Sequence, residues 1–151
     1  MESLAQQLAG DGWTLRTGGA DGADTAFETG HRAAVGARNL EVYLPWNGYN
    51  GRESFEDGTI VLDPPIRHLA ETTAGRLHPA WGRCGRGARA LHARNVAIVR
   101  GHGLDDDVDA VVCWTHDGGA TGGTGMGIRI ARERDIPVFN LLSEPLQFGC
   151  M

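Results

Sequence analysis

The sequence contains no lysine, and all fourteen of its basic residues are arginine. Without lysine the chain cannot form a Schiff base with a substrate, and it has no Walker-type lysine for a nucleotide phosphate. Any phosphate or carboxylate of a ligand must therefore be held by arginine side chains and backbone N–H groups. The net charge of −5 also argues against tight binding of duplex DNA through a broad basic surface.

Cysteines are few, and their pattern is uninformative for metal or disulfide chemistry. Cys84, Cys113 and Cys150 are widely spaced and form no CxxC, which favours reduced thiols over a disulfide framework or a zinc site. The six histidines show no HxH or HExxH spacing, and neither a nucleophile elbow nor an acid–base pair of carboxylates is evident. We therefore expect no metal and no cofactor, and no catalytic residue can be assigned.

Long apolar segments are also missing. No run approaches the roughly 20 residues of a membrane span, and the start MESLAQQLAG lacks the features of a secretory signal. The length of 151 residues, with 41% hydrophobic and 22% charged residues, is typical of a single globular domain over residues 1–151. These properties predict a soluble, cytoplasmic protein.

Helical and strand patterns alternate along the chain, which predicts an open, mostly parallel α/β sheet with helices on both faces. Cys113 falls in an apolar strand and is expected in the core. The second helix is expected to bury Ala23, Ala26, Phe27 and Ala34. The tail after Pro145 is expected to be loose. The predicted helices are 2–9, 24–35, 66–77, 88–99 and one after residue 123; the predicted strands are 13–17, 40–44, 110–114 and 136–142, with 59–62 either a short strand or an extended connection.

The stretch from Leu15 to Glu28, LRTGGADGADTAFE, runs from a strand through glycines into a helix. Glycines at 18, 19 and 22 allow backbone N–H groups to approach a phosphate closely, so this turn is a candidate anion site. Asp21 or Asp24 can cap the helix that follows. The alternative is a tight strand-to-helix turn with a good cap and no ligand.

A second strand–glycine–helix unit follows the strand at 110–114. Six glycines, at 118, 119, 122, 123, 125 and 127, lead into a helix on which Gly127 and Ala131 can lie close to a sheet, with Arg129, Arg132 and Arg134 facing outward. The carboxyl ends of parallel strands meet at one edge of an open α/β sheet, where such folds bind ligands. We therefore expect the two glycine turns to face one site.

Three other segments have both a functional and a structural interpretation. In the loop PWNGYNGRES, the aromatic rings of Trp46 and Tyr49 can stack on a base while Asn47 and Asn50 bond its edge, or the rings can simply fasten the loop. His78 and His116 lie in loops and can contact a ligand, although a surface or capping position is the preferred interpretation. A charged run on a helix is usually a solvated face, but the main basic element here lies between two loops suited to a ligand; it comprises Arg83, Arg86, Arg89 and Arg94.

An acidic run precedes the strand at 110–114. Asp105, Asp106, Asp107 and Asp109 lack the spacing of a calcium loop, so a helix cap followed by a polar turn is the preferred interpretation.

Several blocks together resemble the SLOG superfamily, which joins DprA-like DNA-processing proteins with the LOG-type nucleotide hydrolases, and in particular its small phage and bacterial members. The blocks are TGGADGADTAFE, EVYLPWNGYNG, HP followed by ARNVAIVRG, VVCWTHDG and TGGTGMGIRIA, and they cover nearly all of the chain. The resemblance implies a Rossmann-like fold and a nucleotide site across the two glycine turns, with Arg94 and Asn95 matching the family's RN pair. The candidate ligand-binding residues are Gly18, Gly19, Asp21, Gly22, Asp24, Trp46, Asn47, Arg94, Asn95, Thr115, Thr121, Gly122, Gly123, Thr124 and Gly125.

The chain departs from the family pattern in two places. Arg129 stands where LOG hydrolases carry a glutamate after the glycine–threonine run, which argues against N-glycosidic hydrolysis by their route. Related chains also begin with a strand and a GxGSR-like turn before the first helix, and this chain begins at the helix. The missing strand would lie between the strands at 13–17 and 110–114, so these must either pair directly or be joined by a neighbouring chain.

The expected function is binding of a nucleotide-type small molecule, of the nucleoside monophosphate, NAD or ADP-ribose class, with cleavage of an N-glycosidic or phosphoribosyl bond left open. A non-catalytic sensor or carrier is one alternative, and DprA-like binding of single-stranded DNA is a less favoured one. A dehydrogenase fits poorly, because neither glycine turn is followed by the acidic ribose ligand. A homo-oligomer without membrane contact is expected.

Overall fold

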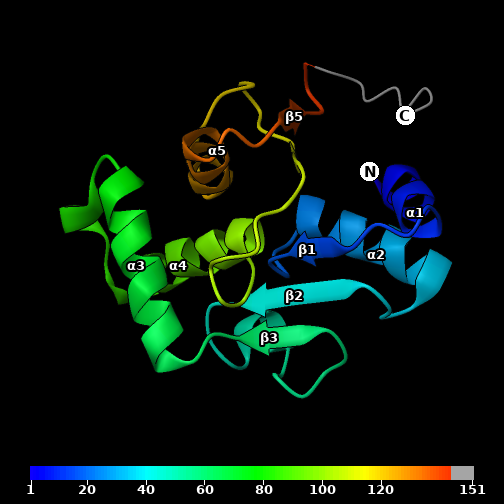
Figure 1. The fold of residues 1–151 in the computed structure, drawn as a ribbon, viewed down its shortest axis with the longest axis horizontal. Coiled ribbons are helices and arrows are strands. Elements are labelled where there is room, and N and C mark those ends of the chain that lie inside the picture. The colour runs from blue at the N-terminus through cyan, green and yellow to red at the C-terminus, as the bar shows by residue number, and fades with distance from the viewer. Residues whose placement is uncertain (144–151) are drawn as a thin grey trace.

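The computed structural model describes residues 1–143 and has a Rossmann-like open α/β fold, as the sequence predicts (Figure 1). The predicted tail after Pro145 lies outside the described residues. No described helix has the length and apolar character needed to cross a membrane. In chain order the elements are α1 (Glu2–Gly10), β1 (Leu15–Thr17), α2 (Ala23–Val35), β2 (Leu40–Leu44), the 3₁₀ helix η1 (Tyr49–Gly51), β3 (Thr59–Val61), α3 (Pro64–Leu77), the 3₁₀ helix η2 (Trp81–Arg83), α4 (Arg86–Arg100), β4 (Val111–Cys113), α5 (Thr124–Glu133) and β5 (Val138–Asn140).

The strands form two parallel sheets rather than one. The order in the larger sheet is β1-β2-β3, and β4 pairs with β5 in the smaller sheet. Within the described residues β1 and β4 do not pair with each other, so the expectation that they close up directly is wrong for this chain. One reason is that the segment between α4 and β4 lies beside β1, where Arg16 donates to the backbone oxygen of Asp106 at 2.6 Å and to its carboxylate.

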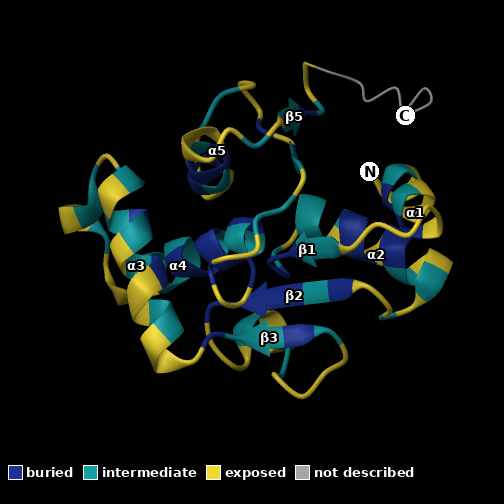
Figure 2. Cartoon of the chain, viewed as in Figure 1, coloured by how far each residue is buried: buried dark blue, intermediate teal, exposed yellow. Residues whose placement is uncertain are grey.

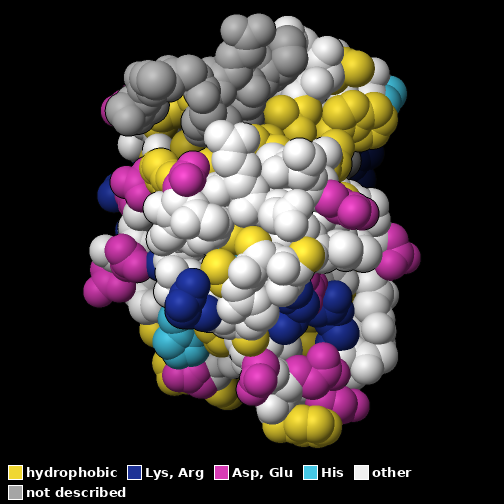
Figure 3. All heavy atoms as spheres, turned by 90° about the vertical axis from the view of Figure 1, so that its right-hand side faces the viewer, with side chains coloured by type: hydrophobic (Ala, Val, Ile, Leu, Met, Phe, Trp, Pro, Cys, Tyr) yellow, Lys and Arg dark blue, Asp and Glu magenta, His cyan; other side chains and the backbone are white. Residues whose placement is uncertain are grey.

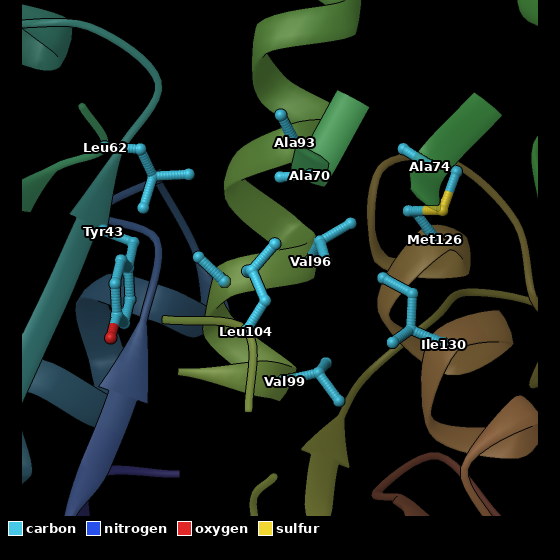
Figure 4. Close-up of a cluster of buried hydrophobic side chains, with 11 residues drawn as sticks. Tyr43, Leu62, Ala70, Ala74, Ala93, Val96, Val99, Leu104, Met126 and Ile130 are labelled. Carbon is cyan, nitrogen blue, oxygen red and sulfur yellow. The ribbon is translucent and has the colours of Figure 1, made fainter. Parts of the chain in front are cut away.

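The strand β2 is the centre of the larger sheet, and its side chains are buried on both faces (Figure 2). Tyr43 joins the main core, in which residues from α3, α4 and α5 meet (Figure 4). Leu40, Val42 and Leu44 form a second apolar cluster on the opposite face. Helix α4 contacts β1, β2, α3 and α5, and α5 in turn contacts β4 and β5, so the two helices together join the larger sheet to the smaller one.

Helix α2 packs against α1, and its buried face agrees only in part with the predicted one. Gly30 lies against the backbone of Glu2, and a side chain at this position would overlap the Glu2 carbonyl. Ala34 is exposed, whereas Glu28 and His31 are buried. The predicted face is thus confirmed for Phe27, which is buried, and wrong for Ala34, while Ala23 and Ala26 are half-buried. Glu28 and His31 can be buried because Arg32 and Arg52 each lie 2.8 Å from the Glu28 carboxylate and His31 bonds a backbone oxygen.

Several strands are shorter than their apolar patterns predict. Trp13 and Trp114 flank β1 and β4, but they are 43% and 45% exposed rather than part of the strands. The pairing of β4 with β5 is limited to three residues on each strand. Cys113 is buried as predicted, and burial raises the pKa of its thiol. The segment at 59–62 does form a short strand, β3.

The acidic run forms ion pairs with arginines. Asp107 accepts from Arg134 at 2.7 Å and from Arg100 at 3.3 Å, while Asp106 pairs with Arg16. No helix begins at this run, so its predicted function as a helix cap is wrong. The turn lies at residues 102–103, just before the run, and Asp105, Asp106 and Asp107 have no regular structure. These pairs fasten the segment between α4 and β4 to the larger sheet and to the end of α5, because Arg16 belongs to β1 and Arg134 follows α5.

Candidate functional site

An open cleft with a volume of about 670 Å³ lies where the two glycine turns approach helix α4. The first turn contributes Ala20, and the second contributes residues 120–123. The two units predicted to face one site do therefore meet, although their strands belong to separate sheets. The lining residues are Ala20, Tyr49, His78, Pro79, Ala88, Leu91, His92, Arg94, Asn95, Ala120, Thr121, Gly122, Gly123 and Arg129.

In the first turn an aspartate occupies the backbone donors that were expected to hold an anion. Asp24 Oδ2 accepts from the N–H of Gly18 at 3.2 Å and of Ala20 at 3.1 Å. The N-cap of α2 is Gly22, which has no side-chain cap bond, and Asp21 is exposed. The predicted aspartate cap is thus wrong, because Asp24 stabilises the turn before the helix instead of the first helical N–H groups.

Arg94 extends from α4 to the same turn and is 6% exposed. Its Nη1 donates to the carbonyl of Gly18 and lies 3.8 Å from Asp24 Oδ2, while its guanidinium lies 5.7 Å from the ring centre of Tyr49. Gly18 is needed for this packing, since a Cβ there would overlap the guanidinium. Burial lowers the pKa of Arg94, and the Asp24 carboxylate opposes that shift. Arg94 therefore fastens the first turn to α4 and presents only part of its surface to the cleft.

The second turn is braced by its own polar side chains. Asp117 Oδ1 accepts from the N–H of Gly119 at 3.0 Å and from the hydroxyl of Thr121 at 2.9 Å. Asn95, the other member of the RN pair, donates from α4 to the carbonyl of Gly123 at 2.9 Å. Gly122 and Gly123 leave their backbone open, because nothing lies within 4 Å of where their Cβ atoms would be.

Arg129 faces the cleft rather than the outside. It lines the cleft, and its Nη2 donates to the carbonyl of Ala120 at 3.1 Å. Arg132 is exposed and Arg134 pairs with Asp107, so the outward orientation predicted for all three holds only for these two. Gly127 also differs from its prediction, because open space surrounds it. On α5 it is Gly125 that needs its small size, against the carbonyl of Ala120.

Several candidate residues do not line the cleft. Asn47 accepts from the N–H of Ser54 at 2.7 Å and donates to Glu53, which fastens its own loop. Thr115 is buried and accepts from Asn140 at 2.7 Å, which joins the ends of β4 and β5. Trp46 is 41% exposed and meets Tyr49 edge to face. The candidates outside the lining are Gly18, Gly19, Asp21, Gly22, Asp24, Trp46, Asn47, Thr115, Thr124 and Gly125.

Two histidines and a cysteine that the sequence pattern did not single out as a set meet beside the cleft. Ligand atoms of His78, Cys84 and His92 lie within 4.8 Å of one another. The sulfur of Cys84 lies 3.7 Å from His78 Nδ1, and the rings of His78 and His92 are 4.5 Å apart. Burial lowers the pKa of His92, and His78 adds to that shift. His116, the other candidate histidine, is exposed and does not line the cleft.

The arginines before and on α4 are only partly a solvated face. Arg89 stacks on Trp81, 5.2 Å from the ring centre, and donates to the carbonyl of Cys84 at 3.0 Å. Arg86 and Arg89 border a second, smaller hollow of about 240 Å³ that is also lined by Glu71 and Cys84.

On the face shown in Figure 3, acidic and basic side chains are interspersed, so this face offers no continuous basic surface for a nucleic acid.

Comparisons of the whole chain with protein-family models, with curated proteins and with solved structures find no match. The resemblance to the SLOG superfamily therefore depends on the motifs of the chain itself.

Proposed function

We propose that the cleft binds a nucleotide or nucleotide-derived small molecule, of the nucleoside monophosphate, NAD or ADP-ribose class. The observation that carries this proposal is the composition of the lining. Within the described residues it contains Arg94, Arg129, two histidines and two glycine turns, and no carboxylate. A lining of this kind favours an anionic ligand, and a volume of about 670 Å³ is in the range of small-molecule sites.

The second glycine turn is the better candidate for the phosphate. Gly122 and Gly123 place open backbone at the N-terminus of α5, where the helix dipole favours a negative charge. Arg129, one turn further along α5, lines the same part of the cleft. In the first turn, by contrast, Asp24 already accepts from two backbone N–H groups and would repel a phosphate.

The remaining wall fits the nucleoside part of such a ligand. Tyr49 and Leu91 offer an aromatic and an apolar surface, and His92 adds a ring on α4. Aromatic rings stack on bases of any sequence, and Asn95 supplies an amide at the boundary with the second turn. The cleft therefore combines a cationic end with an aromatic wall, as recognition of a nucleotide requires.

The lining favours binding without hydrolysis. Hydrolysis of an N-glycosidic bond by the LOG route uses a carboxylate to activate water, and no carboxylate of the described residues lines the cleft. Arg129 occupies the place of the LOG glutamate and faces the cleft, where its charge would neutralise phosphate. A nucleotide sensor or carrier is thus the function that we favour over a nucleotide hydrolase.

Isothermal titration of the full chain with AMP, NAD and ADP-ribose tests this proposal. We expect saturable binding of at least one of these ligands, and chromatography of the incubated mixture should detect no released base. Release of base at a rate proportional to protein concentration would replace the sensor by a hydrolase. If no member of the panel binds and the matched nucleosides do not bind either, a nucleotide function is wrong.

Arg129→Gln should weaken the nucleotide that binds best by about 1.5–3 kcal/mol, because it removes a charged hydrogen bond to phosphate. Arg132→Gln is the matched control, since Arg132 lies on the same helix but is exposed. Isothermal titration of both variants compares the two positions. Equal losses for Arg129→Gln and Arg132→Gln would mean that general charge, and not a site at Arg129, attracts the ligand.

We also propose that the protein self-associates through the unpaired strand edges. In the described residues β1 and β3 each pair only with β2, and β4 and β5 pair only with each other, so both sheets have edges that no described strand pairs. Trp13 and Trp114, which are exposed beside these strands, supply apolar surface for an interface. A second copy of the chain would satisfy these edges.

Sedimentation equilibrium at micromolar concentration should give the mass of a dimer or a larger oligomer. Trp13→Arg and Trp114→Arg should shift the protein toward the monomer, whereas Trp46→Arg, at a comparably exposed tryptophan of another loop, should not. A wild-type mass of one chain would contradict self-association.

A further inference from the structure

We propose that His78, Cys84 and His92 form a binding site for a Zn²⁺-class transition-metal ion in the wall of the cleft. The three residues, called here the His–Cys cluster, come from different local elements. His78 is the C-cap of α3, Cys84 is the C-cap of η2, and His92 lies in α4. Both histidines also line the cleft proposed for a nucleotide, but the metal site and its test need no nucleotide.

The geometry of the His–Cys cluster is close to that of a tetrahedral metal site. Zinc–nitrogen bonds of about 2.0–2.1 Å and zinc–sulfur bonds of about 2.3 Å place neighbouring ligand atoms about 3.3–3.6 Å apart. The sulfur of Cys84 lies 3.7 and 3.8 Å from the two ring nitrogens of His78, and all three residues offer ligand atoms within 4.8 Å of one another.

The donor types also favour a metal ion. A thiolate and two imidazoles are ligands that Zn²⁺ prefers. His92 Nδ1 is buried and makes no hydrogen bond within the described part of the chain. A buried polar atom without a partner is costly, and ligation would satisfy it.

The surrounding turn holds the cysteine in place. Cys84 N–H donates to the carbonyl of Trp81 at 3.0 Å, and Arg89 Nε donates to the carbonyl of Cys84 at the same distance. His78 Nδ1 accepts from the N–H of Ala80 at 3.1 Å. Metal binding by His78 must break this hydrogen bond from Ala80, whichever ring nitrogen binds the metal. If Nδ1 binds, its single lone pair is taken by the metal; if Nε2 binds, Nδ1 carries the proton and can no longer accept.

Three protein ligands leave the fourth position of a tetrahedral ion free. The His–Cys cluster is half-buried, and both of its histidines line the cleft, so the fourth ligand would come from there. An open position is typical of zinc sites that bind or activate a ligand, whereas purely structural sites are closed by four protein ligands. Water or an anionic group in the cleft can fill it.

Titration of the full chain with Co²⁺ under reducing conditions tests this site. Cobalt replaces zinc with the same ligands and reports on them spectroscopically. We expect one equivalent to produce a thiolate-to-cobalt charge-transfer band together with the visible bands of a tetrahedral ion, and Zn²⁺ should abolish both. The amide resonance of Ala80 should shift at the same time, since its partner is taken by the metal.

Variants assign the ligands. Cys84→Ser should abolish the charge-transfer band, and His78→Gln and His92→Gln should each weaken Co²⁺ at least tenfold, with unchanged far-ultraviolet circular dichroism as the check on folding. Cys150→Ser and His116→Gln are the controls for a thiol and an imidazole that are not proposed ligands, and both should bind as the wild type does. The proposal is overturned by a band that survives in Cys84→Ser, by a band that disappears in Cys150→Ser, or by wild-type protein that gives no band.

Discussion

Arg94→Ala should lower the free energy of unfolding by about 3 kcal/mol, because it removes a buried guanidinium and leaves the partly exposed Asp24 carboxylate without its ion-pair partner. The Arg94 guanidinium donates to the carbonyl of Gly18, lies near the carboxylate of Asp24 and covers the ring of Tyr49. Its loss leaves the first glycine turn without its connection to α4. Urea denaturation followed by circular dichroism measures the change.

Arg132→Ala is the matched control for this substitution. Arg132 lies on α5 and is exposed, so its removal should change stability by less than about 0.5 kcal/mol. If Arg94→Ala were as mild as its control, Arg94 would not fasten the turn. Its side chain would then be free to bind a ligand directly.

Gly18→Ala should destabilise the protein by about 2–3 kcal/mol, because the added methyl group overlaps the Arg94 guanidinium in a closely packed site. In the Arg94→Ala background the same substitution should cost far less, since the group that it displaces is already absent. The double-mutant cycle should therefore give a coupling energy of about 1.5 kcal/mol or more. Additive effects of Gly18→Ala and Arg94→Ala would contradict the direct contact between these residues.

Gly127→Ala shows what a methyl group does where nothing opposes it. Gly127 lies in α5 with open space around it, so alanine should stabilise the helix by about 0.5–1 kcal/mol. A loss of stability in Gly127→Ala would instead support the close approach to a sheet that the sequence predicts.

The order of helices and strands could be predicted because each element has its own local signal. The strand β2 matches its predicted bounds, since an apolar run is bounded by Asn39, with φ +56°, and by Pro45. The separation of the sheets could not be predicted from such signals. It depends on where Arg16 meets Asp106, and these residues are 90 positions apart.

The side-chain contacts of the site were harder to predict than its location. An aspartate at position 24 looks the same in sequence whether it caps a helix or accepts from Gly18 and Ala20 in the preceding turn. Arg129 lies on a helix whose polar face was taken to be outward, and only the position of the second turn shows that this face borders a cleft.

The His–Cys cluster had no recognisable signal in the sequence. Its members are separated by five and by seven residues, which matches no common metal motif. They meet because α3 and α4 pack against each other, with η2 between them in the chain. Gly75 on α3 leaves room for the Trp81 ring, which lies 3.1 Å from where the Gly75 Cβ would be. A search for cysteine and histidine around the connection between two predicted helices and on the second of them would have found the set.

A titration of ¹⁵N-labelled protein with ADP-ribose, followed by amide resonances, tests the proposed cleft most directly, because it reports both binding and position. The account predicts saturable shifts at Thr121, Gly122 and Gly123, at Asn95 on α4 and at Arg129 on α5, with little change at α1. It is contradicted if ADP-ribose, AMP and NAD all leave these resonances unchanged, or if the shifts gather at residues away from the cleft.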